Sequence, residues 1–303
     1  MKTGSFPSRR LLPIRAFQMH LTHYDPAWVK RKAVEKRFNM KLALEVVDRA
    51  AAAGFTHLII DIEDAVRYKS HPELRRPYSV PISELAKLAA RARSRGLDVI
   101  PKSNFSQSPL HRHNHWFRPH HDLFDAPLYF RRAFRIIDEI RRACRPKRFF
   151  HIGMDEDHER SHRQYVRAIK ALSAGLRKRG LRAVIWNDTA ERWNRAEVYA
   201  EKCLAAEARI PRSVVEVVWD YHGVRPDVFK RLRRRGFEVW VAPGWNPVQI
   251  AKMHAAAVRA GARGIVFTLW IPCRPGNRGR FLARIAQMAE LRGKGELRES
   301  YRR

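Results

Sequence analysis

Two adjacent carboxylates end the segment His151-Ile-Gly-Met-Asp155-Glu156. Alternation along a strand sends His151, Gly153 and Asp155 to one face, and Glu156 can turn into the same site where the strand ends. Neighbouring carboxylates repel each other, and burial beside aromatic walls disfavours charge, so one of the two should hold its proton near neutral pH. Cleavage of a glycosidic bond needs such an acid to protonate its leaving group.

The same acidic stretch has a structural alternative. Asp157, Glu159 and Ser161 could instead cap the helix that follows, because such side chains accept hydrogen bonds from the first N–H groups of a helix. In that case the acidic residues would serve the fold alone.

Aromatic and polar residues recur at the ends of apolar runs. A sugar ring has an apolar C–H face and a fringe of hydroxyl groups, so its binding sites combine flat aromatic walls with Asp, Asn and Glu partners. The alternative is that the tryptophans only fill the interior. We expect the following residues to bind the substrate: His20, Asp61, Asn104, His151, Trp186, Asp188, Trp219, Tyr221, Trp245 and Trp270.

Short apolar runs alternate with amphipathic helical patterns along almost the whole chain. The expected strands are Ala16–Leu21, Phe55–Ile62, Leu97–Ile100, Phe149–Met154, Leu181–Trp186, Val214–Trp219, Phe237–Val241 and Ile265–Trp270. The expected helices are Lys41–Ala53, Ile82–Arg95, Phe130–Arg142, Arg163–Arg179, Ala196–Ala208, Asp227–Arg235, Val248–Ala260 and Arg280–Leu291. Glycine follows five of the helices, where a left-handed stop is expected.

Eight strand and helix units predict a single (β/α)8 barrel of the α/β class. The boundaries expected are an N-terminal extension over residues 1–15, the barrel over 16–291 and a basic C-terminal tail over 292–303. An open, doubly wound sheet is the alternative fold, but no G-x-G-x-x-G follows the first strand. In a barrel the C-terminal ends of the strands form the active face, which is where the substrate-binding candidates lie.

The segment from His151 to Glu156 resembles the signature H-x-G-G-D-E of glycoside hydrolase family 20, the β-N-acetylhexosaminidases. Residues 41–61 and 82–101 resemble the second and third units of that family. Its sugar-stacking tryptophans lie on the strands that carry Trp186, Trp219 and Trp270 here. The resemblance covers essentially the whole chain.

The resemblance implies an exo-acting enzyme that hydrolyses its substrate with retention, using the 2-acetamido carbonyl of the sugar as the nucleophile. By the same resemblance, Glu156 is the general acid and base, Asp155 orients the acetamido group, and His151 supports the pair from behind. No second carboxylate is then required about 5 Å away, because the family is an exception to the two-carboxylate scheme.

The chain also departs from the family pattern. Met154 replaces the second glycine of the signature, and Lys102 stands where an acidic residue is usual. The first strand ends at His20 rather than at the sugar-binding arginine of the family. Trp245 and Asn246 follow the seventh strand, where a tyrosine normally touches the acetamido group. These departures indicate a divergent member.

The chain is strongly basic, with 61 Lys and Arg against 30 Asp and Glu and a net charge of +31. Because the arginines are spread through helical segments, we interpret most of them as a solvated exterior, with a polyanion site as the alternative. Cys144, Cys203 and Cys273 lack metal-binding or disulfide spacing. No apolar run fits a signal peptide or membrane span, so we expect a soluble cytoplasmic protein.

Two rival functions remain open. A metal-dependent barrel could draw ligands from His20, Asp61, Glu63, His151, Asp155 and His158. The histidines at 111, 113, 115, 120 and 121, mixed with Trp116, are expected to form a surface lid. A noncatalytic barrel that binds carbohydrate or polyanion is the second rival. We expect a carbohydrate partner, for which an anionic sugar would suit the charge, with no cofactor, no membrane and no specific nucleic acid.

Overall fold

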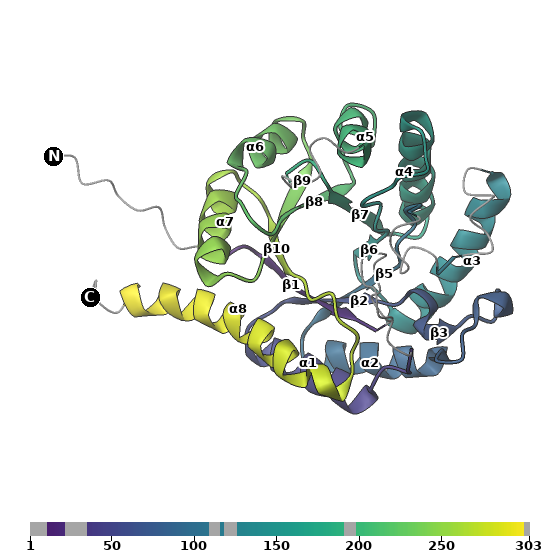
Figure 1. Ribbon diagram of the computed structural model, residues 1–303, viewed down its shortest axis with the longest axis horizontal. Helices are drawn as coiled ribbons and strands as arrows, with labels where there is room; N and C mark the ends of the chain where they lie inside the picture. Colours follow the sequence, from purple (N-terminus) through teal and green to yellow (C-terminus); the bar gives the residue numbers. More distant parts are fainter. Residues whose placement is uncertain (1–10, 22–34, 109–115, 118–125, 191–197, 300–303) are drawn as a thin grey trace.

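The computed structural model describes residues 11–21, 35–108, 116–117, 126–190 and 198–299 of the 303-residue chain. Eight parallel strands close into a barrel in the order β1-β10-β9-β8-β7-β6-β5-β2 (Figure 1). These strands are β1 (Ile14–His20), β2 (His57–Asp61), β5 (Asp98–Lys102), β6 (Phe149–His151), β7 (Arg182–Asn187), β8 (Val215–Asp220), β9 (Glu238–Pro243) and β10 (Gly264–Phe267). The predicted barrel is confirmed, and the open sheet is excluded.

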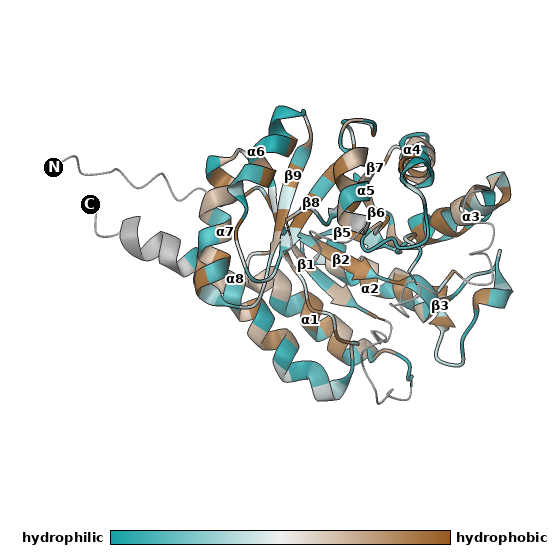
Figure 2. Ribbon diagram, turned by 45° about the horizontal axis from the view of Figure 1, so that its top comes forward, coloured by the Kyte–Doolittle hydropathy of each residue, from teal (hydrophilic) through white to brown (hydrophobic). Residues whose placement is uncertain are grey.

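Helices surround the barrel and mix polar and apolar residues along their length (Figure 2). They are α1 (Met40–Ala52), α2 (Ile82–Ser94), α3 (Pro127–Cys144), α4 (His162–Arg177), α5 (Val198–Ala206), α6 (Pro226–Arg234), α7 (Pro247–Arg259) and α8 (Arg278–Glu299). Between β2 and α2 the chain adds a small parallel sheet of β3 (Val66–Arg67) and β4 (Val80–Pro81), which the sequence pattern did not predict. No helix in the described residues is long and apolar enough to cross a membrane.

Local signals in the sequence explain where several helices begin and end. The side chain of Asn39 caps α1 by accepting a hydrogen bond from the backbone N–H of Leu42. Ser161 and Gln164 form a capping box at the start of α4. The predicted left-handed stops are confirmed, because positive φ angles occur at Gly54, Gly96, Gly180, Gly236 and Gly261.

The barrel interior contains an aromatic plug that the sequence pattern did not reveal. Trp240 is fully buried there and lies beside Phe149, with ring centroids 5.1 Å apart. Its strand partner is Gly264, where an added Cβ would lie 2.5 Å from the Trp240 ring. Glycine at the start of β10 therefore makes room for a large side chain where barrel cores usually hold Val, Ile or Leu.

Several predicted boundaries are wrong at the carboxyl ends of elements. The fourth barrel strand, β6, ends at His151 instead of Met154, so strand alternation does not reach Asp155. The last strand, β10, ends at Phe267, which places Trp270 beyond it. Helix α8 continues to Glu299, so residue 292, the expected start of a tail, lies within the helix.

Candidate active site

A cavity of about 280 Å³ lies at the C-terminal ends of the barrel strands. Below it is called the mouth cavity. It is lined by Asp155, Glu156, Trp186, Trp219, Tyr221, Trp245, Leu269, Trp270, Ile271 and Arg280. The structure thus brings the adjacent carboxylates together with the four tryptophans that the sequence placed at strand ends.

Aromatic rings form a nearly continuous wall of the mouth cavity. The ring of Tyr221 lies between those of Trp219 and Trp245, at centroid distances of 5.3 and 5.0 Å. The indole N–H of Trp270 donates to the Tyr221 hydroxyl at 2.6 Å, and the Trp270 ring lies 5.9 Å from that of Trp186. Trp186 also belongs to the apolar barrel interior, so it both fills the core and borders the cavity.

The loop after β6 carries the two carboxylates in an unusual backbone conformation. Gly153, Met154 and Glu156 all have positive φ angles, of 71°, 74° and 48°. A Cβ at Gly153 would lie 2.0 Å from the Asn104 side-chain oxygen, so no other residue fits there. Met154 therefore keeps a glycine-like conformation at the position where the resemblance shows glycine, with a cost of roughly 1–2 kcal/mol.

Hydrogen bonds from three elements hold this loop. The backbone N–H of Met154 donates to Asn104 Oδ1 at 3.0 Å, and the Tyr165 hydroxyl donates to the Met154 carbonyl at 2.8 Å. The backbone N–H of Glu156 donates to Asp188 Oδ2 at 3.0 Å. Because these contacts fix the backbone on both sides of Asp155, they determine the direction in which the carboxylates point.

Asp155 is buried and receives a hydrogen bond from Asn104 Nδ2 at 2.7 Å. Burial raises the pKa of Asp155 to about 6, although the charge of Lys102 acts to lower it, and the adjacent Glu156 raises it further. The sequence predicted that one of the two carboxylates would hold its proton near neutral pH. Asp155 is the carboxyl group whose pKa is raised, but a pKa of about 6 leaves it mostly ionised at pH 7, so a proton held at neutral pH is not borne out for it.

Asp188 lies behind the cavity wall. Its Oδ1 accepts a hydrogen bond from the Trp219 indole at 2.8 Å, while Oδ2 accepts the one from Glu156. Burial and the nearby Asp155 and Glu156 raise the pKa of Asp188 well above its ordinary value. Asp188 therefore connects the carboxylate loop to an aromatic wall residue and does not itself line the cavity.

A fully buried cluster of ionisable side chains lies beneath the mouth cavity. Asp61 Oδ2 is 2.6 Å from Lys102 Nζ and 2.9 Å from His20 Nδ1. Burial opposes ionisation of Asp61, but Lys102 and His20 outweigh it and hold the pKa of Asp61 well below its usual range. Burial and the charge of Asp61 raise the pKa of Glu63, whose Oε1 lies 3.9 Å from Lys102 Nζ. Lys102 lies 5.7 Å from the Trp270 ring centroid, so it supports the aromatic wall.

Five of the ten predicted substrate-binding residues do not line the cavity but lie buried behind it: His20, Asp61, Asn104, His151 and Asp188. Their side chains lie in the barrel interior, and their contact with a substrate stays a prediction. His151, for example, accepts a hydrogen bond from the Gly153 N–H at 3.0 Å and lies 4.7 Å from the Trp186 ring. Burial lowers the pKa of His151 well below its ordinary value.

Three residues that line the cavity were not predicted from the sequence: Leu269, Ile271 and Arg280. Arg280 belongs to the first turn of α8, not to a strand end, so the rule that selected the other candidates could not find it. It is exposed and supplies a positive charge to the cavity wall.

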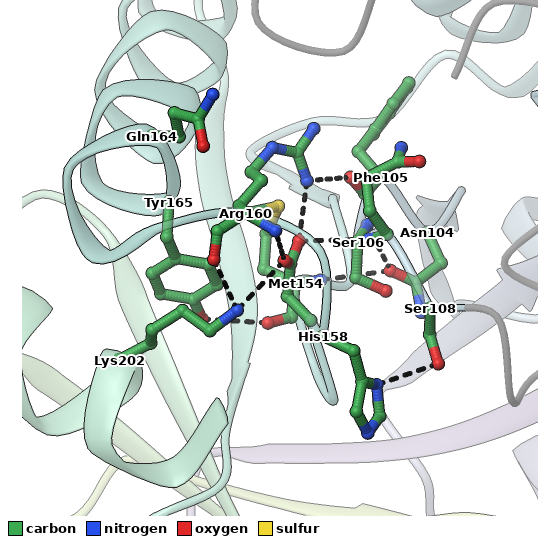
Figure 3. A network of polar contacts seen from close by, with 12 residues as sticks. Asn104, Phe105, Ser106, Ser108, Met154, His158, Arg160, Gln164, Tyr165 and Lys202 are labelled. Carbon is green, nitrogen blue, oxygen red and sulfur yellow. Dashed lines mark hydrogen bonds and ion pairs between the residues drawn. The ribbon is translucent and has the colours of Figure 1, made fainter. Parts of the chain in front are cut away.

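A buried ionic network anchors the far end of the carboxylate loop (Figure 3). Arg160 donates to Asp157 Oδ2 at 2.7 Å, and Lys202 donates to the Arg160 carbonyl at 2.6 Å. Ser161, just beyond this network, caps α4 as the structural alternative proposed. Asp155 and Glu156 take no part in that cap, so the acidic stretch divides into a cavity part and a capping part.

The described residues bear on the rival metal centre and on part of the predicted lid. Among the described residues, no group of three or more His, Cys, Asp or Glu side chains could hold a metal ion. The five histidines between residues 111 and 121 lie outside the described residues. Trp116 is described and is buried, packed against Phe105 with centroids 5.4 Å apart, so its assignment to a surface lid is wrong.

Comparison with solved structures shows that this fold is shared with family 20 glycoside hydrolases. The family 20 β-N-acetylhexosaminidase of Streptomyces coelicolor A3(2) matches with a TM-score of 0.68 and 15% identity, over 93% of this chain and 64% of that one. The family 20 exo-β-N-acetylglucosaminidase of Vibrio harveyi, solved in complex with N-acetylglucosamine, matches with a TM-score of 0.61 and 14% identity, over 94% of this chain and 57% of that one.

Dispersin B matches with a TM-score of 0.53 and 14% identity, over 91% of this chain and 97% of that one. No protein-family model and no curated protein matches the sequence. The chain spans less than two thirds of the length of the Streptomyces structures that it matches. The resemblance stated from the sequence is confirmed at the level of the fold, which is the barrel of family 20.

Proposed function

We propose that the chain is a glycoside hydrolase that releases terminal β-linked N-acetylhexosamine by substrate-assisted, retaining hydrolysis. In this proposal Glu156 protonates the glycosidic oxygen and then deprotonates water, while Asp155 orients the acetamido N–H of the sugar. The observation that carries the proposal is the adjacent pair Asp155 and Glu156 in a cavity walled by four tryptophans.

The placement of the two carboxylates favours assistance by the substrate. An enzyme nucleophile and a general acid must act from opposite faces of one sugar ring. Asp155 and Glu156 are neighbours on one short loop, so they cannot readily occupy opposite faces. Asp155 is also held by Asn104 at 2.7 Å, as a residue that orients a ligand group must be held.

In this proposal Tyr221, which follows β8, supplies the hydroxyl donor that family 20 takes from a tyrosine after the seventh strand. Its oxygen accepts the hydrogen bond from the Trp270 indole at 2.6 Å. In this proposal the Tyr221 hydroxyl donates to the acetamido carbonyl and steadies it for attack on the anomeric carbon. The resemblance gives this role to a tyrosine after β9, where this chain has Trp245. In this proposal Tyr221 takes the role instead.

The test is a panel of nitrophenyl β-glycosides with and without a 2-acetamido group, assayed with Glu156→Gln. We expect hydrolysis of the 2-acetamido substrates and a loss of kcat of roughly 10²–10⁴-fold in the variant, the range for removal of a general acid. Glu159→Gln is the matched control, because it makes the same chemical change on the same loop outside the mouth cavity.

Two outcomes would overturn the proposal. One is unchanged turnover in a correctly folded Glu156→Gln variant, which would remove Glu156 from the mechanism. The other is binding of N-acetylhexosamines by the wild-type chain with no hydrolysis of any glycoside in the panel, which would favour a noncatalytic sugar-binding barrel.

A further inference from the structure

Basic residues are frequent at the end of the barrel opposite the mouth cavity. Helices α1, α2, α3, α4, α6 and α7 all have arginine in their last turn, and in a (β/α)8 barrel those turns surround the N-terminal ends of the strands. One cation per helix end is explained by the helix dipole. Clusters such as Arg141 and Arg142, or Arg231, Arg233 and Arg234, exceed that requirement.

A hollow of about 540 Å³ lies within this basic end, between the last turns of α3 and α4. We call it the basal hollow, and its basic lining residues are Arg141, Arg142, Arg145, Lys147 and Arg179. None of its lining residues is acidic. The wall of the mouth cavity, in contrast, carries Asp155 and Glu156 together with a single basic residue, Arg280.

Nearby carboxylates neutralise only part of the basal hollow. Arg179 forms a two-pronged ion pair with Asp138, and Lys147 lies 2.7 Å from Asp98. Within the part of the chain that the structure describes, the side chains of Arg142 and Arg145 form no hydrogen bond or ion pair. Both are exposed, so their guanidinium groups are available to an anion from solution.

Arg145 also occupies a position that does not suit it. It ends α3 in the left-handed conformation, with φ 49° and ψ 55°, where five other helices use glycine. The other non-glycine residues with positive φ among the described ones are Glu63, Met154 and Glu156, all at the mouth end. Such conformations cluster at functional sites, so the strain at Arg145 is an observation independent of its charge.

We propose that the basal hollow binds sulfate or phosphate groups of an anionic polysaccharide, with Arg142 and Arg145 as the contacting cations. The planar guanidinium fork matches two oxygens of such a group. The binding itself does not depend on the proposed glycosidase activity, and only the choice of polysaccharide rests on it. A polymer held at the base leaves the mouth free to accept a chain end.

The test measures binding to immobilised heparin across a series of salt concentrations, with Arg142→Glu/Arg145→Glu. We expect at least about tenfold weaker binding, and a slope of log Kd against log salt that falls by about two, one for each lost contact. Hydrolysis of a small nitrophenyl glycoside should be unchanged, since both residues are remote from the mouth. If the glycosidase proposal is wrong, the hydrolysis assay alone will show it, and the heparin measurement still tests the basal hollow.

Lys41→Glu/Lys252→Glu is the matched control, because it makes the same change of net charge at exposed positions in the first turn of α1 and the middle of α7, outside the basal hollow. We expect this variant to weaken heparin binding by no more than about twofold. An equal loss in both double variants would mean a diffuse basic surface and would overturn the site.

The variant Arg145→Gly tests whether Arg145 serves anion binding or only ends α3. Glycine relieves the left-handed strain, so the melting temperature should rise while heparin binding weakens. A variant that is more stable and binds heparin as the wild type does would show that Arg145 only ends a helix. Tighter binding to duplex DNA than to heparin of equal charge would overturn the choice of a polysaccharide.

Discussion

Asn104 Nδ2 lies 2.7 Å from Asp155 Oδ1, and the same Asn104 side chain accepts the backbone N–H of Met154 through its oxygen. One amide thus holds both the carboxylate and the backbone that carries it. Because β5 is paired with β6, the residues that follow β5 are next to the carboxylate loop. The sequence placed Asn104 among the sugar contacts, whereas the structure makes it a positioning residue.

Asn104→Ala should lower kcat/KM for 2-acetamido substrates by about 10²-fold, the scale of a small misplacement in an active site. Its hydrogen bond lowers the pKa of Asp155, so its loss raises that pKa above about 6. If ionised Asp155 is the active form, activity falls as the pH falls through this pKa, and the acidic limb of the kcat/KM profile should move to higher pH.

Ser106→Ala is the control for this variant. The backbone N–H of Ser106, not its hydroxyl, donates to Asn104 Oδ1 at 3.0 Å, so the substitution preserves that contact. Its acidic limb should coincide with that of the wild type. An Asn104→Ala variant that loses activity with no movement of the limb would contradict the link between Asn104 and Asp155.

Trp245→Ala should weaken substrate binding with little effect on the fold. Trp245 is 44% exposed although it lines the mouth cavity. Loss of one stacking face is worth about 1 kcal/mol, so KM should rise by roughly fivefold to tenfold while the melting temperature stays close to that of the wild type. Val248→Ala, at a residue that is 61% exposed and outside the cavity, should leave KM unchanged. An unchanged KM in Trp245→Ala would contradict its place in a sugar site.

Glu216→Gln tests a neutral carboxyl group in the barrel. Burial raises the pKa of Glu216 to about 8 from an ordinary value of 4.5, and its side chain accepts a hydrogen bond from Asn187. Between these two pH values the unfolded chain loses a proton that the folded chain keeps, so wild-type stability falls by about 1.4 kcal/mol per pH unit from this group.

Glutamine stays neutral and can accept the same bond, so the advantage of the variant over the wild type should grow as the pH rises through this range. Urea unfolding at several pH values measures the difference between the two proteins. The range from pH 5 to 8 lies between the ordinary pKa of Glu216 and its raised value in the fold. If the difference in unfolding free energy between the two proteins stays constant over this range, Glu216 is not neutral in the folded protein.

The sequence was informative where local rules apply. Apolar periodicity and glycine stops predicted the order of the barrel strands, and the rule that functional residues follow strand ends found Trp186, Trp219 and Trp270. These features depend on neighbours in the chain, so a single sequence contains them. The adjacency of Asp155 and Glu156 in the mouth cavity was likewise expected, although through a strand that ends earlier than predicted.

The features that escaped prediction depend on contacts between distant segments. Trp240 fits the barrel interior only because Gly264 lies opposite, and Arg280 reaches the mouth cavity from the first turn of α8. His20 and Asp61 had the residue types of sugar ligands, but they are buried below the cavity, where one oxygen of Asp61 contacts both His20 and Lys102. Periodicity carries no information about such pairings.

In the proposed mechanism the substrate supplies the nucleophile and Asp155 only orients the acetamido group. The most direct measurement is the ratio of kcat/KM for a nitrophenyl N-acetyl-β-glucosaminide to that for the matching β-glucoside, in the wild type and in Asp155→Asn. We expect the substitution to lower this ratio by about 10²-fold, because only the acetamido substrate uses the lost contact. An equal loss on both substrates, with a covalent glycosyl adduct on Asp155 of the wild type, would contradict it.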